Sequence, residues 1–144
     1  IKGDIWYYHK KTNWVCITTN GSLKKNGECV MGRGVALQAK QKFPLLPKKL
    51  GQRIKDTGNN VYLWPEEKLV TFPVKNYWYE KASLDLIKNS CVSLLENVKY
   101  YFHDNESFYI VRPGCGNGQL KWEDVRPILA QYFSDDRFII VNNE

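Results

Sequence analysis

The sequence has few metal-binding residues and no long hydrophobic run. Its four cysteines, Cys16, Cys29, Cys91 and Cys115, form no CxxC pair, and its two histidines stand apart from them. Metal centres need several such ligands at short spacing, so we expect neither a metal site nor a metal cofactor. No secretory leader, membrane-spanning run or lipidation motif is present, and we therefore expect a cytoplasmic protein with no membrane contact and with reduced thiols.

Neither of the common nucleotide-binding fingerprints is complete. Gly32 and Gly34 begin a G-x-G-x-x-G pattern, but Leu37 stands where its third glycine would be. This loop also lacks the Lys-Ser/Thr pair that ends a P-loop, and no Lys stands in the P-loop position after Gly114, Gly116 and Gly118. These absences argue against a hydride-transferring Rossmann enzyme and against a phosphoryl-transferring NTPase.

What the sequence does contain is two glycine-rich loops, at residues 30–37 (the first Gly loop) and 113–120 (the second Gly loop). Both run into a predicted helix, and such junctions present free backbone N–H groups and a positive helix end to an anion. Either loop alone is also compatible with a simple tight turn. Together they predict a ligand with more than one phosphate-like or ribose-like part, held from two sides.

Length and charge narrow the class of protein. A chain of 144 residues is expected to form one domain, here spanning residues 1–144. A net charge of +6 favours anionic partners such as nucleotides, nucleic acid or an acidic protein. The basic residues are spread out, which is more typical of solvated faces than of a continuous nucleic-acid groove.

Hydrophobic periodicity predicts strands that alternate with helices. Strands are expected at residues 4–8, 14–18, 60–64, 69–74, 107–112 and 138–141, and helices at 32–43, 47–57, 83–102 and 122–133. The alternation predicts an α/β fold with a mixed, partly parallel sheet and helices on both faces. Ligands of such sheets bind at the carboxyl ends of the strands, where both Gly loops fall.

Three motifs make the chain resemble the macro domain, an ADP-ribose-binding module. They are Gly3-Asp4-Ile5, Val30-Met31-Gly32-Arg33-Gly34-Val35-Ala36, and Gly114-Cys115-Gly116-Asn117-Gly118-Gln119-Leu120-Lys121-Trp122. The resemblance covers essentially the whole chain, in the expected order. It implies a three-layer α-β-α fold that binds ADP-ribose as a monomer and without a cofactor.

The chain is most similar to the branch that contains the DNA ADP-ribosyl glycohydrolase antitoxins and the terminal ADP-ribose protein glycohydrolase. The stretch Phe72-Pro73-Val74-Lys75-Asn76-Tyr77-Trp78 resembles the one that carries the catalytic lysine of that branch, which is Lys75 here. The protein glycohydrolase has an Asp in the second loop, where this chain has Gly118. This difference favours ADP-ribosylated DNA over protein as the substrate. The alternative interpretation is that Lys75 is an ordinary surface lysine without a catalytic role.

The resemblance also assigns binding roles. Asp4 would accept a hydrogen bond from the adenine amino group, Ile5 would lie against adenine and Asn20 would contact the distal ribose, although the 18–29 segment is longer than the usual family loop. The expected ADP-ribose contacts are Asp4, Ile5, Asn20, Met31, Gly32, Arg33, Gly34, Val35, Gly114, Cys115, Gly116, Asn117 and Gly118.

Simpler roles remain open for three residues. Asp4 is also compatible with a turn at a strand end. Cys115 is either a small loop filler or a reactive thiol near a positive helix start. Trp122 is either a buried helix anchor or a surface on which a base stacks.

These features predict an ADP-ribosyl glycohydrolase. A lysine amine near the anomeric carbon of the distal ribose can attack it, or its charge can stabilise the leaving group. Desolvation in a crevice would lower the pKa of Lys75 and free the amine. Two alternatives stay open, a phosphatase acting on ADP-ribose-1″-phosphate and a non-catalytic reader or sponge of ADP-ribose or a related nucleotide.

Overall fold

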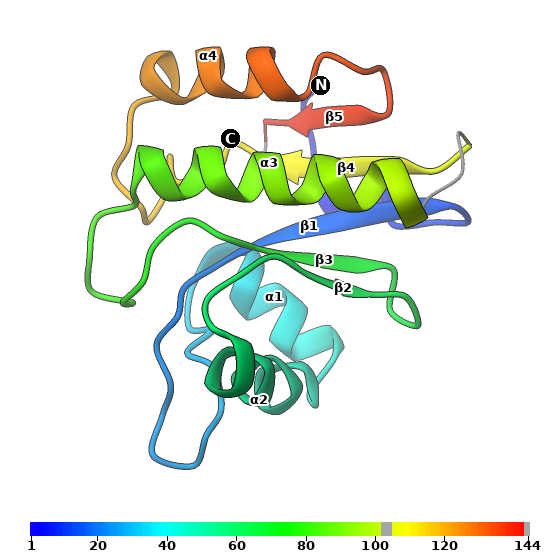
Figure 1. Ribbon diagram of the computed structural model, residues 1–144. Helices are drawn as coiled ribbons and strands as arrows, with labels where there is room; N and C mark the ends of the chain where they lie inside the picture. Colours follow the sequence, from blue (N-terminus) through cyan, green and yellow to red (C-terminus); the bar gives the residue numbers. More distant parts are fainter. Residues whose placement is uncertain (102–104, 143–144) are drawn as a thin grey trace.

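A five-stranded sheet with the order β2-β3-β1-β4-β5 lies at the centre of the molecule (Figure 1). It is seen in a computed structural model that describes residues 1–101 and 105–142. The strands are β1 (Asn13–Thr19), β2 (Tyr62–Trp64), β3 (Leu69–Pro73), β4 (Ser107–Val111) and β5 (Phe138–Val141). Strand β1 runs parallel to β3 and β4, and β5 runs parallel to β4, whereas β2 is antiparallel to β3. The predicted mixed sheet is therefore confirmed.

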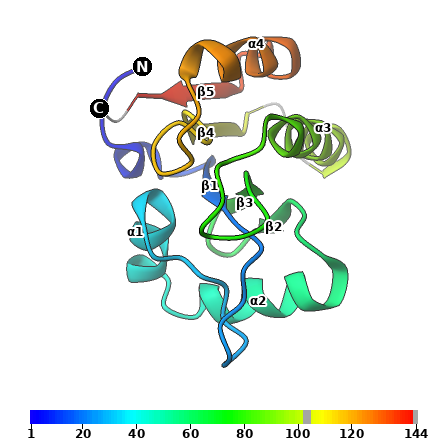
Figure 2. The same ribbon diagram turned by 90° about the vertical axis from the view of Figure 1, so that its left-hand side faces the viewer.

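Helices cover both faces of this sheet and complete three layers. They are α1 (Gly34–Lys42), α2 (Leu46–Thr57), α3 (Leu84–Tyr101) and α4 (Trp122–Tyr132). Helices α1 and α2 lie on one face, and α3 and α4 lie on the other (Figures 1 and 2). The predicted helices are all present, with starts that differ by up to two residues. Phe102, placed in the predicted 83–102 helix, lies outside the described residues.

The near-continuous hydrophobic run of β1 follows from its position between two cores. Cys16 points into the core shared with α3 and α4, while Val15 and Ile17 enter the core shared with α1 and α2. Successive side chains of a strand point to opposite faces, so a strand covered on both sides needs hydrophobic residues at every position.

The predicted strand at residues 4–8 is wrong, because this segment forms a 3₁₀ helix, η1 (Ile5–Tyr8). The Asp4 carboxylate caps η1 by accepting a hydrogen bond from the Trp6 backbone N–H at 3.0 Å. The chain touches the sheet earlier, where Lys2 forms an isolated parallel bridge with Asn142. Ile5–Tyr8 is a short, continuous apolar run, and periodicity alone cannot tell whether such a run is a strand or a helical turn. The Asp4 cap favours the helical turn.

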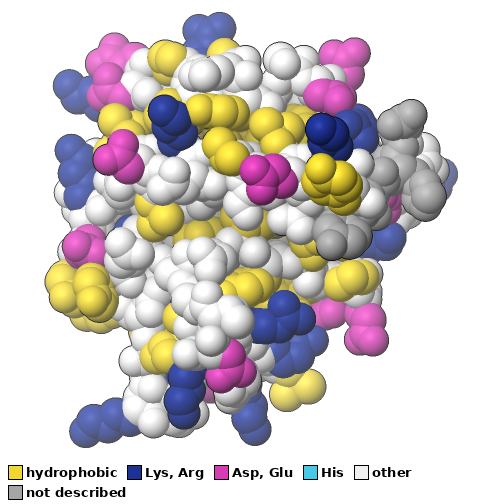
Figure 3. All heavy atoms as spheres, viewed as in Figure 1, with side chains coloured by type: hydrophobic (Ala, Val, Ile, Leu, Met, Phe, Trp, Pro, Cys, Tyr) yellow, Lys and Arg dark blue, Asp and Glu magenta, His cyan; other side chains and the backbone are white. Residues whose placement is uncertain are grey.

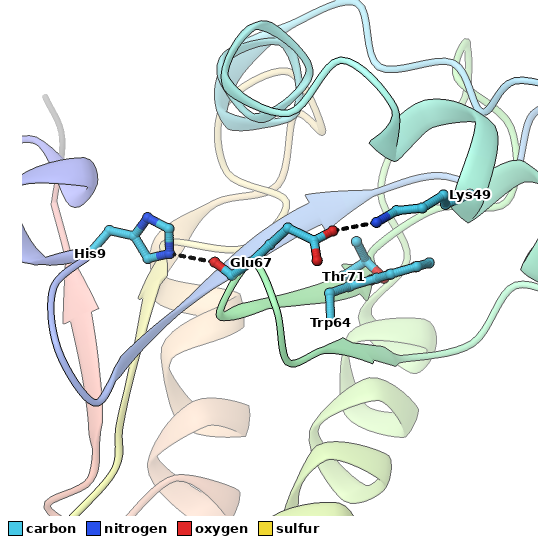
Figure 4. A network of polar contacts seen from close by, with 5 residues as sticks. All are labelled: His9, Lys49, Trp64, Glu67 and Thr71. Carbon is cyan, nitrogen blue, oxygen red and sulfur yellow. Dashed lines mark hydrogen bonds and ion pairs between the residues drawn. The ribbon is translucent and has the colours of Figure 1, made fainter.

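A polar network closes the end of the sheet opposite the Gly loops (Figure 4). The Lys49 ammonium of α2 lies 2.6 Å from the Glu67 carboxylate, and His9 Nε2 lies 2.8 Å from the Glu67 carbonyl oxygen. Nearby, Trp64 Nε1 donates to Thr71 Oγ1 at 3.0 Å. These contacts join α2, the segment after η1 and the β2–β3 turn. The two Gly loops lie at the opposite end of the sheet, where the parallel strands end.

Within residues 1–101 and 105–142, none of the helices combines the length and the apolar character that a bilayer crossing requires.

Candidate functional site

A pocket of about 590 Å³ opens at the carboxyl ends of the parallel strands. Figure 2 faces this end of the molecule, where the loops after β1, β3 and β4 meet the start of α1. Its lining comes from residues 18–20, 30, 32–36, 74, 75, 78–80, 111, 112, 114–119 and 142. Segments far apart in the sequence therefore build one cavity at the predicted place.

Most of the predicted site residues line this pocket. They are Asn20, Gly32, Arg33, Gly34, Val35, Lys75, Gly114, Cys115, Gly116, Asn117 and Gly118.

Three predicted ADP-ribose contacts lie outside the lining. Asp4 caps η1, as described above, and the side chains of Ile5 and Met31 are buried in the core beneath α1 and α2. Their contact with ADP-ribose stays a prediction.

The first Gly loop brings the start of α1 to the pocket. Arg33 precedes the helix in an extended conformation, and Gly34 has a φ of 58°, which favours glycine. The N–H groups in the first turn of a helix have no acceptor within it. Because Gly34, Val35 and Ala36 all line the cavity, this turn presents an anion-binding helix end to it.

The second Gly loop is tightly folded against residue 82. Gly114 has a φ of 76°, and its carbonyl oxygen accepts a hydrogen bond from the Leu120 N–H at 2.9 Å. A Cβ atom on Gly118 would lie 2.5 Å from the Gly114 oxygen and 2.7 Å from the Ala82 Cβ. A side chain at position 118 would therefore displace the loop, and the glycine found there has a steric reason.

Lys75 lies on the wall of the pocket, just after β3. Its Nζ donates to the Trp78 carbonyl oxygen at 2.9 Å. Burial lowers the pKa of Lys75 first, and the positive charge of Arg33 lowers it further, while the Glu80 carboxylate acts in the opposite direction. The predicted direction of the pKa shift and its main cause are both confirmed.

The loop that carries Lys75, residues 74–82 (the lysine loop), is held in place by neighbouring segments. Asn59 Nδ2 donates to the Lys75 carbonyl oxygen at 3.0 Å, and the Gly21 N–H donates to the Asn76 carbonyl oxygen at 3.0 Å. The Trp78 N–H also donates to Ser22 Oγ at 2.9 Å. Residues 20–29 (the support loop) therefore position the lysine loop.

Asn20 organises the support loop as well as lining the pocket. Its Oδ1 accepts a hydrogen bond from the Ser22 N–H at 2.9 Å, and its Nδ2 donates to the Val30 carbonyl oxygen at 3.0 Å. Both ends of the amide are thus engaged with backbone groups. The contact of Asn20 with the distal ribose stays a prediction.

Arg112 is a pocket residue that sequence reasoning missed. Its guanidinium lies over the Trp122 ring, 4.8 Å from the ring centroid. Arg112 Nε is buried and has no hydrogen-bond partner in the described part of the chain. Its only sequence signal was its place directly before the second Gly loop.

Trp122 packs against the core beside α3 and α4, as the helix-anchor interpretation expects.

The chain is similar in sequence to proteins of named function. No family model matches the chain. The DNA ADP-ribosyl glycohydrolase of Mycobacterium tuberculosis is 30% identical over 117 residues, which cover 72% of this chain and 32% of the relative. A DNA ADP-ribosyl transferase–DNA ADP-ribosyl glycohydrolase fusion protein of Thermosipho africanus is 22% identical, with 93% of this chain and 38% of the relative covered. The chain thus spans about a third of the length of the curated relatives it matches.

Comparison with solved structures identifies the fold family. The chain matches Thermosipho africanus DarTG, solved with ADP-ribose, with a TM-score of 0.81 at 21% identity over 99% of this chain and 40% of that one. It matches the macrodomain of Mycobacterium tuberculosis DarG with a TM-score of 0.77 at 24% identity, over 99% and 95% of the two chains. This chain has the macro domain fold. The resemblance of its motifs to macro domains of the DNA ADP-ribosyl glycohydrolase branch is confirmed.

Proposed function

We propose that this macro domain binds ADP-ribose and hydrolyses the bond that joins ADP-ribose to a base of DNA. The observation that carries the proposal is Lys75, an amine of lowered pKa on the wall of a pocket built from two Gly loops. The names of the curated relatives, and the ADP-ribose in the Thermosipho africanus structure, support the same ligand and reaction.

The diphosphate of ADP-ribose is proposed to lie between the two Gly loops. The first turn of α1 offers free N–H groups there, and a Cβ on Gly34 would lie only 3.3 Å from Asn117 Nδ2, so the loops approach closely. Arg33 and Arg112 add positive charge to the lining. Arg112 Nε would gain an acceptor from the bound ligand. The cavity of about 590 Å³ has the size of a typical small-ligand site.

Lys75 is proposed to act at the anomeric carbon C1″ of the distal ribose. Burial and the Arg33 charge disfavour the ammonium form of Lys75, and we propose that the fraction present as neutral amine attacks C1″. In that step Nζ forms a bond to C1″ while the bond from C1″ to the base breaks and its electron pair leaves with the base. Water then displaces the lysine and frees ADP-ribose.

DNA is proposed as the substrate in preference to protein. Gly118 occupies the position at which the terminal ADP-ribose protein glycohydrolase has an Asp. The packing around Gly118 leaves no room for an Asp side chain. The net charge of +6 suits a polyanionic substrate.

The decisive experiment compares wild type with Lys75→Ala and Lys75→Arg. We expect both variants to bind ADP-ribose in calorimetry with affinities within a few-fold of wild type. Both should lose release of ADP-ribose from single-stranded DNA that carries an ADP-ribosylated thymidine, since neither supplies a neutral amine. Full activity of Lys75→Arg would show that only the positive charge matters.

Two results would overturn the proposal. If wild type releases no ADP-ribose from DNA but dephosphorylates ADP-ribose-1″-phosphate, the domain is a phosphatase. If it binds ADP-ribose and turns over neither substrate, it is a reader.

We further propose that the domain acts as a monomer in the reducing cytoplasm. Cys16, Cys29 and Cys91 are buried thiols without a disulfide, and burial raises the pKa of both Cys29 and Cys91 to about 12, which keeps these thiols protonated and unreactive. Light scattering after size exclusion, with and without reductant, should give one monomeric mass.

A further inference from the structure

Three consecutive aromatic side chains lie exposed beside the pocket. Tyr77, Trp78 and Tyr79 are 52%, 55% and 69% exposed. Tyr77 stacks on Tyr79 with ring centroids 5.6 Å apart, and Trp78 packs edge-on against Tyr79 at 5.7 Å. In Figure 3 a hydrophobic patch stands out at the left edge of the molecule, where Figure 1 places the β3–α3 connection. Such a cluster of large apolar side chains in water marks an interaction surface.

This aromatic cluster (Tyr77, Trp78 and Tyr79) is fixed on its scaffold. The Tyr77 N–H donates to Glu80 Oε1 at 2.9 Å, and Trp78 is tied to Ser22 of the support loop through its own N–H. A loop backbone held in this way, with its rings packed on one another, loses less conformational entropy when a ligand stacks on it, so the cluster is preorganised for binding.

The cluster is continuous with the candidate site. Trp78 and Tyr79 line the pocket, and the Trp78 carbonyl oxygen accepts a hydrogen bond from Lys75 Nζ. Tyr77, which directly precedes Trp78, is not part of the lining. A substrate whose reacting atom sits at Lys75 would therefore have its neighbouring parts over these rings.

The charges around the cluster fit a polyanion. The support loop, which contacts Trp78 through Ser22, carries the exposed Lys24 and Lys25. The exposed Lys81 lies two residues after Tyr79, and the single acidic residue between them, Glu80, accepts a hydrogen bond from the Tyr77 N–H. Aromatic rings beside cationic side chains are the usual combination in proteins that bind single-stranded nucleic acid.

We propose that Tyr77, Trp78 and Tyr79 form a stacking platform for the unpaired bases that flank the ADP-ribosylated base in single-stranded DNA. The inference rests on the proposed function for the identity of the modified base. Only unpaired bases can offer their faces to protein rings, since bases in a duplex are stacked on each other. The platform would thus select single strands and would do so without reading the flanking sequence.

The test compares two substrates that differ only in flanking bases, an ADP-ribosylated thymidine nucleoside and a short single-stranded oligonucleotide with the same modified thymidine. We expect Tyr77→Ala to lower kcat/KM for the oligonucleotide about tenfold and to leave the nucleoside unchanged. Tyr77→Phe, which keeps the ring, should behave as wild type. Tyr100→Ala removes another exposed tyrosine, 74% exposed at the far end of α3, and serves as the matched control.

Two other outcomes with an active wild type overturn the platform. An equal loss on both substrates would mean that Tyr77 shapes the lysine loop, and no loss on either would assign the aromatic cluster to another partner, such as a protein. If wild type cleaves neither substrate, the proposed function fails, and the platform is then tested alone. Tyr77→Ala should still weaken binding of a fluorescent oligothymidylate about tenfold relative to Tyr77→Phe, and equal affinities would exclude it.

Discussion

At the scale of single residues, the chemistry of the site depends on how Lys75 is surrounded. Partial burial and the charge of Arg33 disfavour its ammonium form, while Glu80 favours it. These surroundings raise the fraction of neutral amine at a given pH above that of a fully exposed lysine. The neutral amine is the form of lysine that can act as a nucleophile.

The first prediction concerns the pH profile of single-turnover cleavage. If the neutral amine attacks, the rate rises as pH increases towards the lowered pKa of Lys75 and levels off above it. Glu80→Gln removes the one charge that raises this pKa, so the rising limb should shift to lower pH. A rate that falls with increasing pH over this limb would assign the catalytic role to the cation instead.

The second prediction concerns Gly34, whose positive φ disfavours any side chain. Gly34→Glu should weaken ADP-ribose binding at least about tenfold, because its carboxylate would face the phosphates at the anion-binding end of α1. Gly27→Glu is the matched control, since Gly27 also has a positive φ, of 87°, a Cβ there meets no atom within 4 Å, and Gly27 lies outside the pocket lining. Calorimetry with ADP-ribose measures both variants. Unchanged affinity of Gly34→Glu would exclude this loop as the phosphate site.

At the scale of elements, helix α2 holds the support loop that in turn holds the lysine loop. The Cys29 N–H donates to the Pro47 carbonyl oxygen at 2.9 Å. A Cβ on Gly51, in the middle of α2, would collide with the Gly27 carbonyl oxygen. A glycine inside a helix is usually unfavourable, but here it allows a loop backbone to pack directly on the helix.

The third prediction is that Gly51→Ala destabilises the domain although alanine is the better helix former. The helix gains about 1 kcal/mol in intrinsic preference, whereas forcing a methyl group against packed backbone costs about 1–3 kcal/mol or more. We expect a net loss in the free energy of unfolding, measured with urea. Lys55→Ala, at an exposed position of the same helix, should change it by less than about 0.5 kcal/mol. A Gly51→Ala variant more stable than wild type would contradict this packing.

At the scale of the whole molecule, the net positive charge should attract DNA in general, whereas the pocket should recognise ADP-ribose specifically. The net charge is +6, and the ionic interactions of exposed lysines are screened by salt. ADP-ribose carries only two phosphates, which are proposed to contact mainly backbone N–H groups, so its binding should release fewer counterions than binding of a polyanion does. Attraction to DNA and recognition of ADP-ribose should therefore respond differently to ionic strength.

The fourth prediction tests this separation. Between about 50 mM and about 200 mM salt, affinity for single-stranded oligonucleotide should fall much more steeply than affinity for ADP-ribose. Lys24→Glu, in the support loop, should reduce the salt slope for the oligonucleotide. Lys99→Glu makes the same change of charge near the far end of α3 and should leave the slope closer to wild type. Equal slopes for both variants would mean that only total charge matters.

The sequence by itself determined the layered α/β fold, the two Gly loops and the place of Lys75 after a strand. These features are encoded locally, since alternation in a strand, helix periodicity and glycines at turns each act over a few residues. Thus Ser83 caps α3 as its sequence position indicates, its Oγ accepting a hydrogen bond from the Leu86 N–H at 3.1 Å.

Only the tertiary structure decided which residues share the pocket. It placed Glu80 and Arg112 in the lining, kept Ile5 and Met31 in the core, and made residues 5–8 a 3₁₀ helix in place of a strand. It also left the aromatic cluster in water beside Lys75, although most aromatic residues are expected to fill a core. Such outcomes depend on contacts between segments distant in sequence, and no local pattern contains those contacts.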